Sequence, residues 1–221
     1  MIPLACSISR SYDFTGLGVA HEIFEGNPGN IDRMRGARPE SFIRAIIFLK
    51  VRAYCENEEA NMQILVLYYS KGGNTRRLAQ AVARGIETVP ECRALLRTTQ
   101  EVSKDDFLNS AGIIAGSPVY FGVMAADLKR VFDEFVGIRR RMENKVGAAF
   151  TTSGDPTGGK ETTMISIIQC LLIYGMIVAG DPLDSTGHYG VACVGAPDDK
   201  TAANGEKLGR RVAELCRKLG P

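Results

Sequence analysis

The sequence predicts an α/β fold built on an open parallel sheet with helices on both faces. Apolar segments of strand length alternate with amphipathic segments about five times after residue 62, a pattern typical of repeated strand–helix units. The apolar segments are continuous, as in parallel strands that are buried on both faces. We therefore expect three layers around a five-stranded sheet; if the strand order were 2-1-3-4-5, the loops after strands one, three and four would be neighbours at one edge. Ligands of such sheets bind beyond the carboxyl ends of the strands, where the strand order reverses.

The first half of this pattern is regular. Residues 63–69 predict a buried strand, and a helix is expected over 76–87, where Leu78, Val82 and Ile86 share one face. Further strands are predicted over 92–99, 111–118 and 145–153. Between the last two, helical spacing relates Leu128, Val131, Phe132, Phe135 and Val136.

The second half contains a helix over 160–174 that is apolar nearly all round, so we expect it in the core or in a subunit contact. The segments 175–181 and 189–195 share the region of the fifth strand and are separated by a loop over 181–189. A terminal amphipathic helix is marked by Leu208, Val212, Leu215 and Leu219.

Residues 1–61 differ from the rest because a polar, turn-rich stretch precedes one plausible helix over 41–55. We expect the compact domain to span 62–221 and residues 1–61 to form a loosely ordered N-terminal extension. A start codon assigned too far upstream would give the same appearance.

Composition excludes several classes of function. The net charge of +2 and the lack of a basic, aromatic-rich run argue against nucleic acid as a partner. The longest apolar stretch, 164–180, is interrupted by Ser166 and Gln169 and is short for a membrane span. Six widely spaced cysteines and two histidines show no metal-binding spacing, so we expect no metal and reduced thiols in a cytoplasmic protein.

The turn after the first strand has unusual chemistry. It consists of Ser70, Lys71, Gly72, Gly73, Asn74 and Thr75. Glycines and small polar residues let backbone N–H groups converge at a helix N-terminus, which favours an anion. The turn matches neither the Walker A loop nor the G-x-G-x-x-G fingerprint. A cofactor phosphate monoester fits it, and an ordinary helix cap explains the same residues.

Two more strand ends lead into turns of this kind. The third strand is followed by Pro118, Val119, Tyr120, Phe121 and Gly122, and the fourth ends in Thr152, Ser153, Gly154, Asp155, Pro156, Thr157, Gly158 and Gly159. Aromatic side chains can cover a planar ring, and the later hydroxyls and glycines can wrap the polar edge of a heterocycle. A cap on the core and a flexible connection are the simpler explanations.

Together, in this order and spacing, the three loops resemble those of the flavodoxin-like FMN proteins, most closely the WrbA-type NAD(P)H:quinone oxidoreductases. "VLYYSKGGNT" is similar to the family's phosphate loop, "GSPVYFG" to its loop beside the isoalloxazine ring, and "TSGDPTGGKETT" to its third loop. The resemblance covers about residues 62–220.

The resemblance implies a flavodoxin-like fold with the strand order 2-1-3-4-5, bound FMN, NADH or NADPH as reductant and a quinone-like small acceptor. It implies that residues 70–75 hold the phosphate, that 119–121 contact the isoalloxazine and that 152–157 line its polar side. Tyr174 stands where the family has a histidine, and His188 lies in the corresponding C-terminal loop, where a surface position is an equal alternative. The chain departs from the family in its short connection at 98–110 and its lack of tryptophan.

A flavoenzyme is the leading functional hypothesis, and hydride transfer to flavin requires no general base, so no catalytic residue is assigned. The alternative is a flavodoxin-type electron carrier, but such carriers are usually acidic around the flavin. From residue 62 onward there are 20 Lys and Arg against 17 Asp and Glu, a net charge of +3. A third possibility is a partner module that has lost flavin. The apolar helix over 160–174 makes a homodimer or homotetramer possible.

Overall fold

The structure is a computed structural model that describes residues 62–220. The expected extension over 1–61 and its helix over 41–55 lie outside the described residues. None of the helices within 62–220 is long and apolar enough to cross a membrane.

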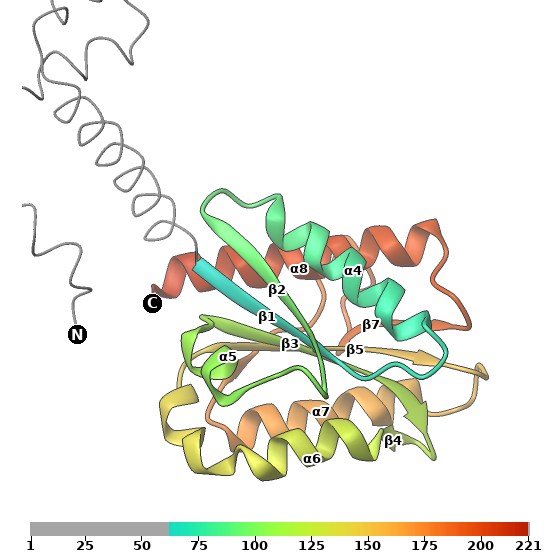
Figure 1. The fold of residues 1–221 in the computed structure, drawn as a ribbon. Helices are drawn as coiled ribbons and strands as arrows, with labels where there is room; N and C mark the ends of the chain where they lie inside the picture. The colour runs from blue at the N-terminus through green and yellow to red at the C-terminus, as the bar shows by residue number, and fades with distance from the viewer. Residues whose placement is uncertain (1–61, 221) are drawn as a thin grey trace, which may run out of the picture. The chain divides into compact units, whose positions relative to one another are not determined.

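Strands and helices alternate through this part of the chain (Figure 1). The elements are β1 (Met62–Tyr68), α4 (Asn74–Glu87), β2 (Cys92–Thr98), α5 (Lys104–Asn109), β3 (Gly112–Tyr120), β4 (Val123–Met124), α6 (Ala126–Glu134), the 3₁₀ helix η3 (Val136–Met142), β5 (Val146–Ser153), α7 (Lys160–Ile173), β6 (Ile177–Val178), β7 (Gly190–Val194) and α8 (Asp199–Leu219).

The predicted sheet is confirmed. Its strands stand in the order β2-β1-β3-β5-β6, with parallel pairing throughout this path. The fifth position is shared by two short strands, because β6 pairs with the start of β5 and β7 pairs with its end. The antiparallel strand β4, which pairs with the end of β3, was not expected.

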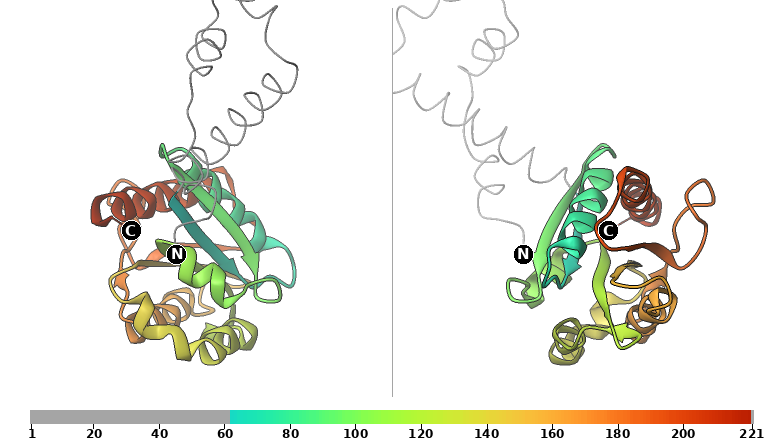
Figure 2. Two further views of the ribbon diagram at one scale, coloured as in Figure 1. Left: turned by 60° about the vertical axis from the view of Figure 1, so that its left-hand side comes forward. Right: turned by 90° about the vertical axis from the view of Figure 1, so that its right-hand side faces the viewer.

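Helices cover both faces of the sheet. Figures 1 and 2 show α4 and α8 on one face and α5, α6 and α7 on the other. The expected inward face of α4, with Leu78, Val82 and Ile86, is fully buried. Close packing of α4 on α8 depends on Gly85, since a Cβ there would collide with the backbone of Glu206. Each face of the sheet has its own apolar core, one formed with α4 and α8 and the other with α5, α6 and α7.

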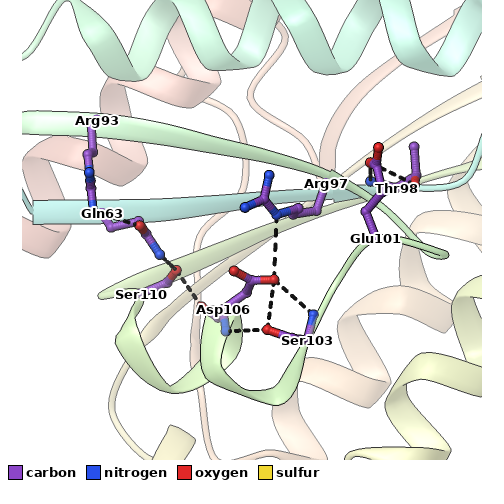
Figure 3. A network of polar contacts seen from close by, with 8 residues as sticks. All are labelled: Gln63, Arg93, Arg97, Thr98, Glu101, Ser103, Asp106 and Ser110. Atoms are coloured by element: carbon purple, nitrogen blue, oxygen red, sulfur yellow. Dashed lines mark hydrogen bonds and ion pairs between the residues drawn. The ribbon is translucent and has the colours of Figure 1, made fainter.

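The connection after β2 holds a short helix, α5, that the sequence analysis treated only as a short link. The Ser103 hydroxyl accepts a hydrogen bond from the Asp106 amide, and the Asp106 carboxylate accepts one from the Ser103 amide, which forms a capping box. Figure 3 shows how Arg97, 3.5 Å from the Asp106 carboxylate, and Gln63, which donates to Ser110, tie this helix to β2 and β1. Six residues are too few to show a helical apolar period.

The apolar helix α7 is only partly buried. Met164, Ile167 and Leu171 face the core, whereas Leu172 and Ile173 in the last turn are 57% and 65% exposed. The core part of the expectation is therefore confirmed for one side of the helix. A subunit contact at its exposed end stays a prediction.

Candidate functional site

The three chemically unusual loops meet at one edge of the sheet, because β1, β3 and β5 are parallel neighbours that end together. The hydroxyls of Thr75 and Thr152 lie 2.9 Å apart and join the first loop to the third. The rings of Tyr69 and Tyr120 pack edge to face with centroids 6.2 Å apart and join the first loop to the second. The predicted convergence of the loops is thus present in the structure.

The second and third loops also touch each other. A Cβ on Gly159 would lie 2.9 Å from the Cα of Gly122, so the two backbones are in close contact. Gly159 has a φ of 97° and is the N-cap residue of α7. The loop after β3 is therefore fixed against the N-terminus of α7.

The first loop leaves a helix N-terminus available. The Ser70 hydroxyl accepts hydrogen bonds from the amides of Gly73 and Arg76, at 3.1 and 3.3 Å. Within residues 62–220, the amides of Asn74 and Thr75 donate to no acceptor. Part of the helix-cap explanation is realised through Ser70, and two donors remain for an anion.

The second loop is a tight hairpin between β3 and β4. Tyr120 pairs with Val123, and the two residues between them, Phe121 and Gly122, have φ values of 53° and 78°. Positive φ at both central positions matches a type I′ turn. A bulky residue rarely adopts this conformation. The Phe121 side chain is also fully exposed, at 105%, so it is not the cap on the core that the simpler explanation required.

The third loop is held by its own side chains rather than being a flexible connection. The Ser153 hydroxyl donates to the Asp155 carbonyl, and the Asp155 carboxylate accepts from the amide and hydroxyl of Thr157. The Thr157 hydroxyl and then its amide lower the pKa of Asp155. Residues 154–157 remain exposed, so the loop presents an ordered polar surface.

A fourth loop, missed in the sequence analysis, completes the edge. It follows β7 and begins at Gly195, whose amide donates to the Ser153 carbonyl at 2.7 Å. It ends at Asp198, whose carboxylate caps α8 through the Thr201 amide. The signal was a Gly-Ala-Pro turn directly after a strand-like segment.

Tyr174 is not brought to these loops within one chain. It follows α7, near Ile177, which pairs with Val146 at the start of β5, whereas the third loop leaves the other end of that strand. Eight strand residues separate the two ends by roughly 25 Å. The Tyr174 ring is buried, and its hydroxyl donates to the Phe132 carbonyl at 2.6 Å. Its role in a single chain is structural.

His188 is also separate from the loop cluster. It is exposed in the loop over 181–189, just before Gly190, which pairs with Ala149 in the middle of β5. Its amide donates to the buried carboxylate of Asp181, which also accepts from Thr186 and Gly187. Within a single chain, His188 is therefore a surface-loop residue, as the alternative interpretation expected.

Known proteins share both sequence and fold with this chain. The model of the NADPH-dependent FMN reductase family matches residues 97–188. An NAD(P)H dehydrogenase (quinone) of Archaeoglobus fulgidus is 34% identical over 188 residues, which cover 71% of this chain and 98% of the relative. The chain belongs to the WrbA-type flavodoxin-like family.

Other relatives of this WrbA-type chain carry different names. A flavodoxin of Aquifex aeolicus is 34% identical over 161 residues, covering 69% of this chain and 85% of the relative. The crystal structure of a WrbA-like flavodoxin from Agrobacterium tumefaciens matches with a TM-score of 0.63 at 24% identity, over 72% of this chain and all of that one, which confirms the predicted fold.

The edge of this WrbA-type chain exposes backbone that fits the phosphate of the FMN that the resemblance implies. A Cβ on Gly72, Gly73, Gly154 or Gly195 would meet no atom within 4 Å. These glycines come from three of the four loops, so a ligand can approach the backbone closely at each of these positions. The two available amides of α4 directly follow Gly73. The residues present therefore fit a phosphate-bearing cofactor.

Thr163 is a further residue that the sequence analysis missed. It lies in the first turn of α7, directly after the third loop, and is completely buried. Its hydroxyl has no hydrogen-bond partner within residues 62–220. A buried hydroxyl without a partner is unusual, but the Thr163 side chain is closed off from solvent, so we assign it no contact with a ligand.

Proposed function

We propose that this chain is an FMN-dependent oxidoreductase that passes electrons from NADH or NADPH to a quinone-like small molecule. One NAD(P)H, one proton and one quinone would yield NAD(P)⁺ and a hydroquinone. The open, glycine-lined edge beside the amides of Asn74 and Thr75 is the observation that carries the proposal. The names of the relatives, NAD(P)H dehydrogenase (quinone) among them, support it.

The first loop would hold the phosphate of FMN. The amides of Asn74 and Thr75 would donate to it at the positive end of α4, and Ser70 would add its hydroxyl hydrogen. This arrangement uses no metal ion.

The second and third loops would hold the ring. Val119, Tyr120 and Phe121 would contact its apolar surface, and Thr152 to Thr157 its polar edge. When bound, FMN supplies the redox chemistry by taking up a hydride equivalent and passing electrons on. The protein orients the ring, and we assign it no acid–base residue.

A flavodoxin-type electron carrier remains the second candidate, because one relative at 34% identity is named a flavodoxin. Acidic side chains around a flavin would steer a carrier to its partner proteins. The net charge of +3 over residues 62–221 favours the enzyme instead.

An anaerobic absorbance titration tests the proposal. The purified protein is mixed with FMN, separated from unbound flavin and titrated with NADH or NADPH. We expect the flavin bands to bleach rapidly and to return when a quinone is added. Flavin that dithionite reduces but neither pyridine nucleotide bleaches would favour the carrier. A protein that takes up no FMN would rule out both.

A further inference from the structure

An apolar groove is lined by residues of α6 and α7. These two helices lie on the sheet face opposite α4 and α8 (Figures 1 and 2). The cavity volume of the groove is about 940 Å³. The lining begins with Tyr120 and Phe121 at the hairpin and ends with Ile173 and Tyr174 beyond α7. From α7 the lining includes residues from Ser166 to Ile173, which span about 10 Å of helix, and it continues past both ends of this stretch to the hairpin and to Tyr174.

The groove presents no unpaired charge. Its charged lining residues, Lys129 and Asp133, pair with each other at 2.6 Å. The hydroxyl of Ser166 accepts from the Met124 amide and donates to the Thr163 carbonyl. Burying a charged ligand here would cost solvation without a partner. The lining therefore selects an uncharged, apolar occupant.

The groove is continuous with the candidate cofactor edge. Tyr120 lines the groove and also packs against Tyr69, which directly precedes the first loop. Phe121 and Val123 line the groove at the hairpin and are strongly exposed. A molecule whose polar end lies at the flavin edge can thus extend an apolar chain along α6 and α7.

We propose that this groove binds the apolar tail of the electron acceptor, a quinone with an alkyl or prenyl chain. The tail would lie along Val136 and Ile173 at the far end, which are otherwise exposed to water. This inference rests on the proposed function, since the quinone headgroup would lie beside FMN.

The test compares two acceptors with the same headgroup. One is 2,3-dimethoxy-5-methyl-1,4-benzoquinone and the other carries an added decyl chain. With the FMN-loaded protein and NAD(P)H, we expect the KM for the decyl quinone to be about tenfold lower, because the chain leaves water. Equal KM values for the two quinones would overturn the proposal.

Two neighbouring residues provide a matched pair of variants. Ile173 lines the groove, whereas Leu172 is similarly exposed but does not line it. We expect Ile173→Ser to raise the KM for the decyl quinone about fivefold and to leave that for the tail-free quinone unchanged. Leu172→Ser should change neither. Equal effects of both variants, or dissociation of an oligomer by Ile173→Ser in light scattering, would instead make this face a protein contact.

Cys170 gives a readout that does not depend on turnover. It lines the groove and is partly accessible. Its alkylation by N-ethylmaleimide, followed by peptide mass spectrometry, should slow at least threefold with the decyl quinone and not with a tail-free quinone whose ring is fully substituted, tetramethyl-1,4-benzoquinone, which cannot add the thiol at a free ring carbon. If neither quinone reoxidises the flavin, the proposed function fails, and this protection still decides whether the groove binds a tail. Equal labelling with both quinones would refute tail binding.

Discussion

The hydroxyl oxygens of Thr75 and Thr152 lie 2.9 Å apart, although the two residues are 77 positions apart in the sequence. Thr75 is in the first turn of α4, and Thr152 is near the end of β5. Both are almost completely buried. The contact therefore fixes the candidate phosphate loop against the candidate flavin loop.

Removing one hydroxyl of this pair should destabilise the protein. Thr75→Val keeps the shape and leaves the Thr152 hydroxyl buried without its partner, so we expect a loss of about 1–2 kcal/mol in unfolding free energy. Urea unfolding of the FMN-free protein measures it. The double variant with Thr152→Val should recover part of the loss, since no polar group is then left unpaired. If the loss in the double variant equalled the sum of the losses in Thr75→Val and Thr152→Val, the two hydroxyls would not be in direct contact.

The first loop should tolerate a side chain at Gly72 better than at Gly73. A Cβ at either position has open space, but Gly73 alone has a positive φ, 88°. Gly73→Ala should cost about 1–2 kcal/mol of stability through backbone strain. Gly72→Ala should cost little, as judged by the same thermal or urea unfolding measurement. Equal losses would show that φ is not the cause.

Tyr174 should matter for folding and not for cofactor affinity. Tyr174→Phe removes the hydroxyl that donates to the buried Phe132 carbonyl, and we expect a loss of about 1–2 kcal/mol in stability. The dissociation constant of FMN, measured by fluorescence quenching, should stay within about twofold of the wild-type value. A large change in that constant would place Tyr174 at the flavin, in a neighbouring subunit.

Asp181 should make the loop over 181–189 sensitive to acid. Burial by itself would raise the pKa of this carboxyl, but hydrogen bonds from Thr186, His188 and Gly187 outweigh it and lower the pKa below its ordinary value of 3.8. Its stabilisation is therefore fully present above about pH 4 and is lost as the pH falls through the lower folded-state pKa.

Asp181→Asn tests this at neutral pH, where we expect a loss of about 2 kcal/mol, because an amide cannot accept all four hydrogen bonds. Asp184→Asn is the matched control. Asp184 lies in the same loop but is exposed, and its ion pair with Lys207 contributes little. Comparable losses for the two variants would argue against a special role of the buried carboxylate.

The sequence by itself determined the alternation of strands and main helices and the unusual chemistry of three loops, whereas the strand order that brings these loops to one edge was implied by the resemblance. The continuous apolar run over 63–69 and the helical spacing of Leu78, Val82 and Ile86 are local patterns. Each forms the element that it predicts, a buried strand and a helix with a buried face. The glycines and hydroxyls of 70–75 also follow from local backbone needs at a helix N-terminus.

Only the tertiary structure decided which residues share the site. Gly195 joins the edge because β7 pairs with the end of β5, and Tyr174 and His188 lie away from it because α7 and the loop over 181–189 end elsewhere on the sheet. The strand register fixes these positions, and a strand's own sequence does not reveal how far along its neighbour it pairs. The groove between α6 and α7 likewise exists only once the two helices pack on one face.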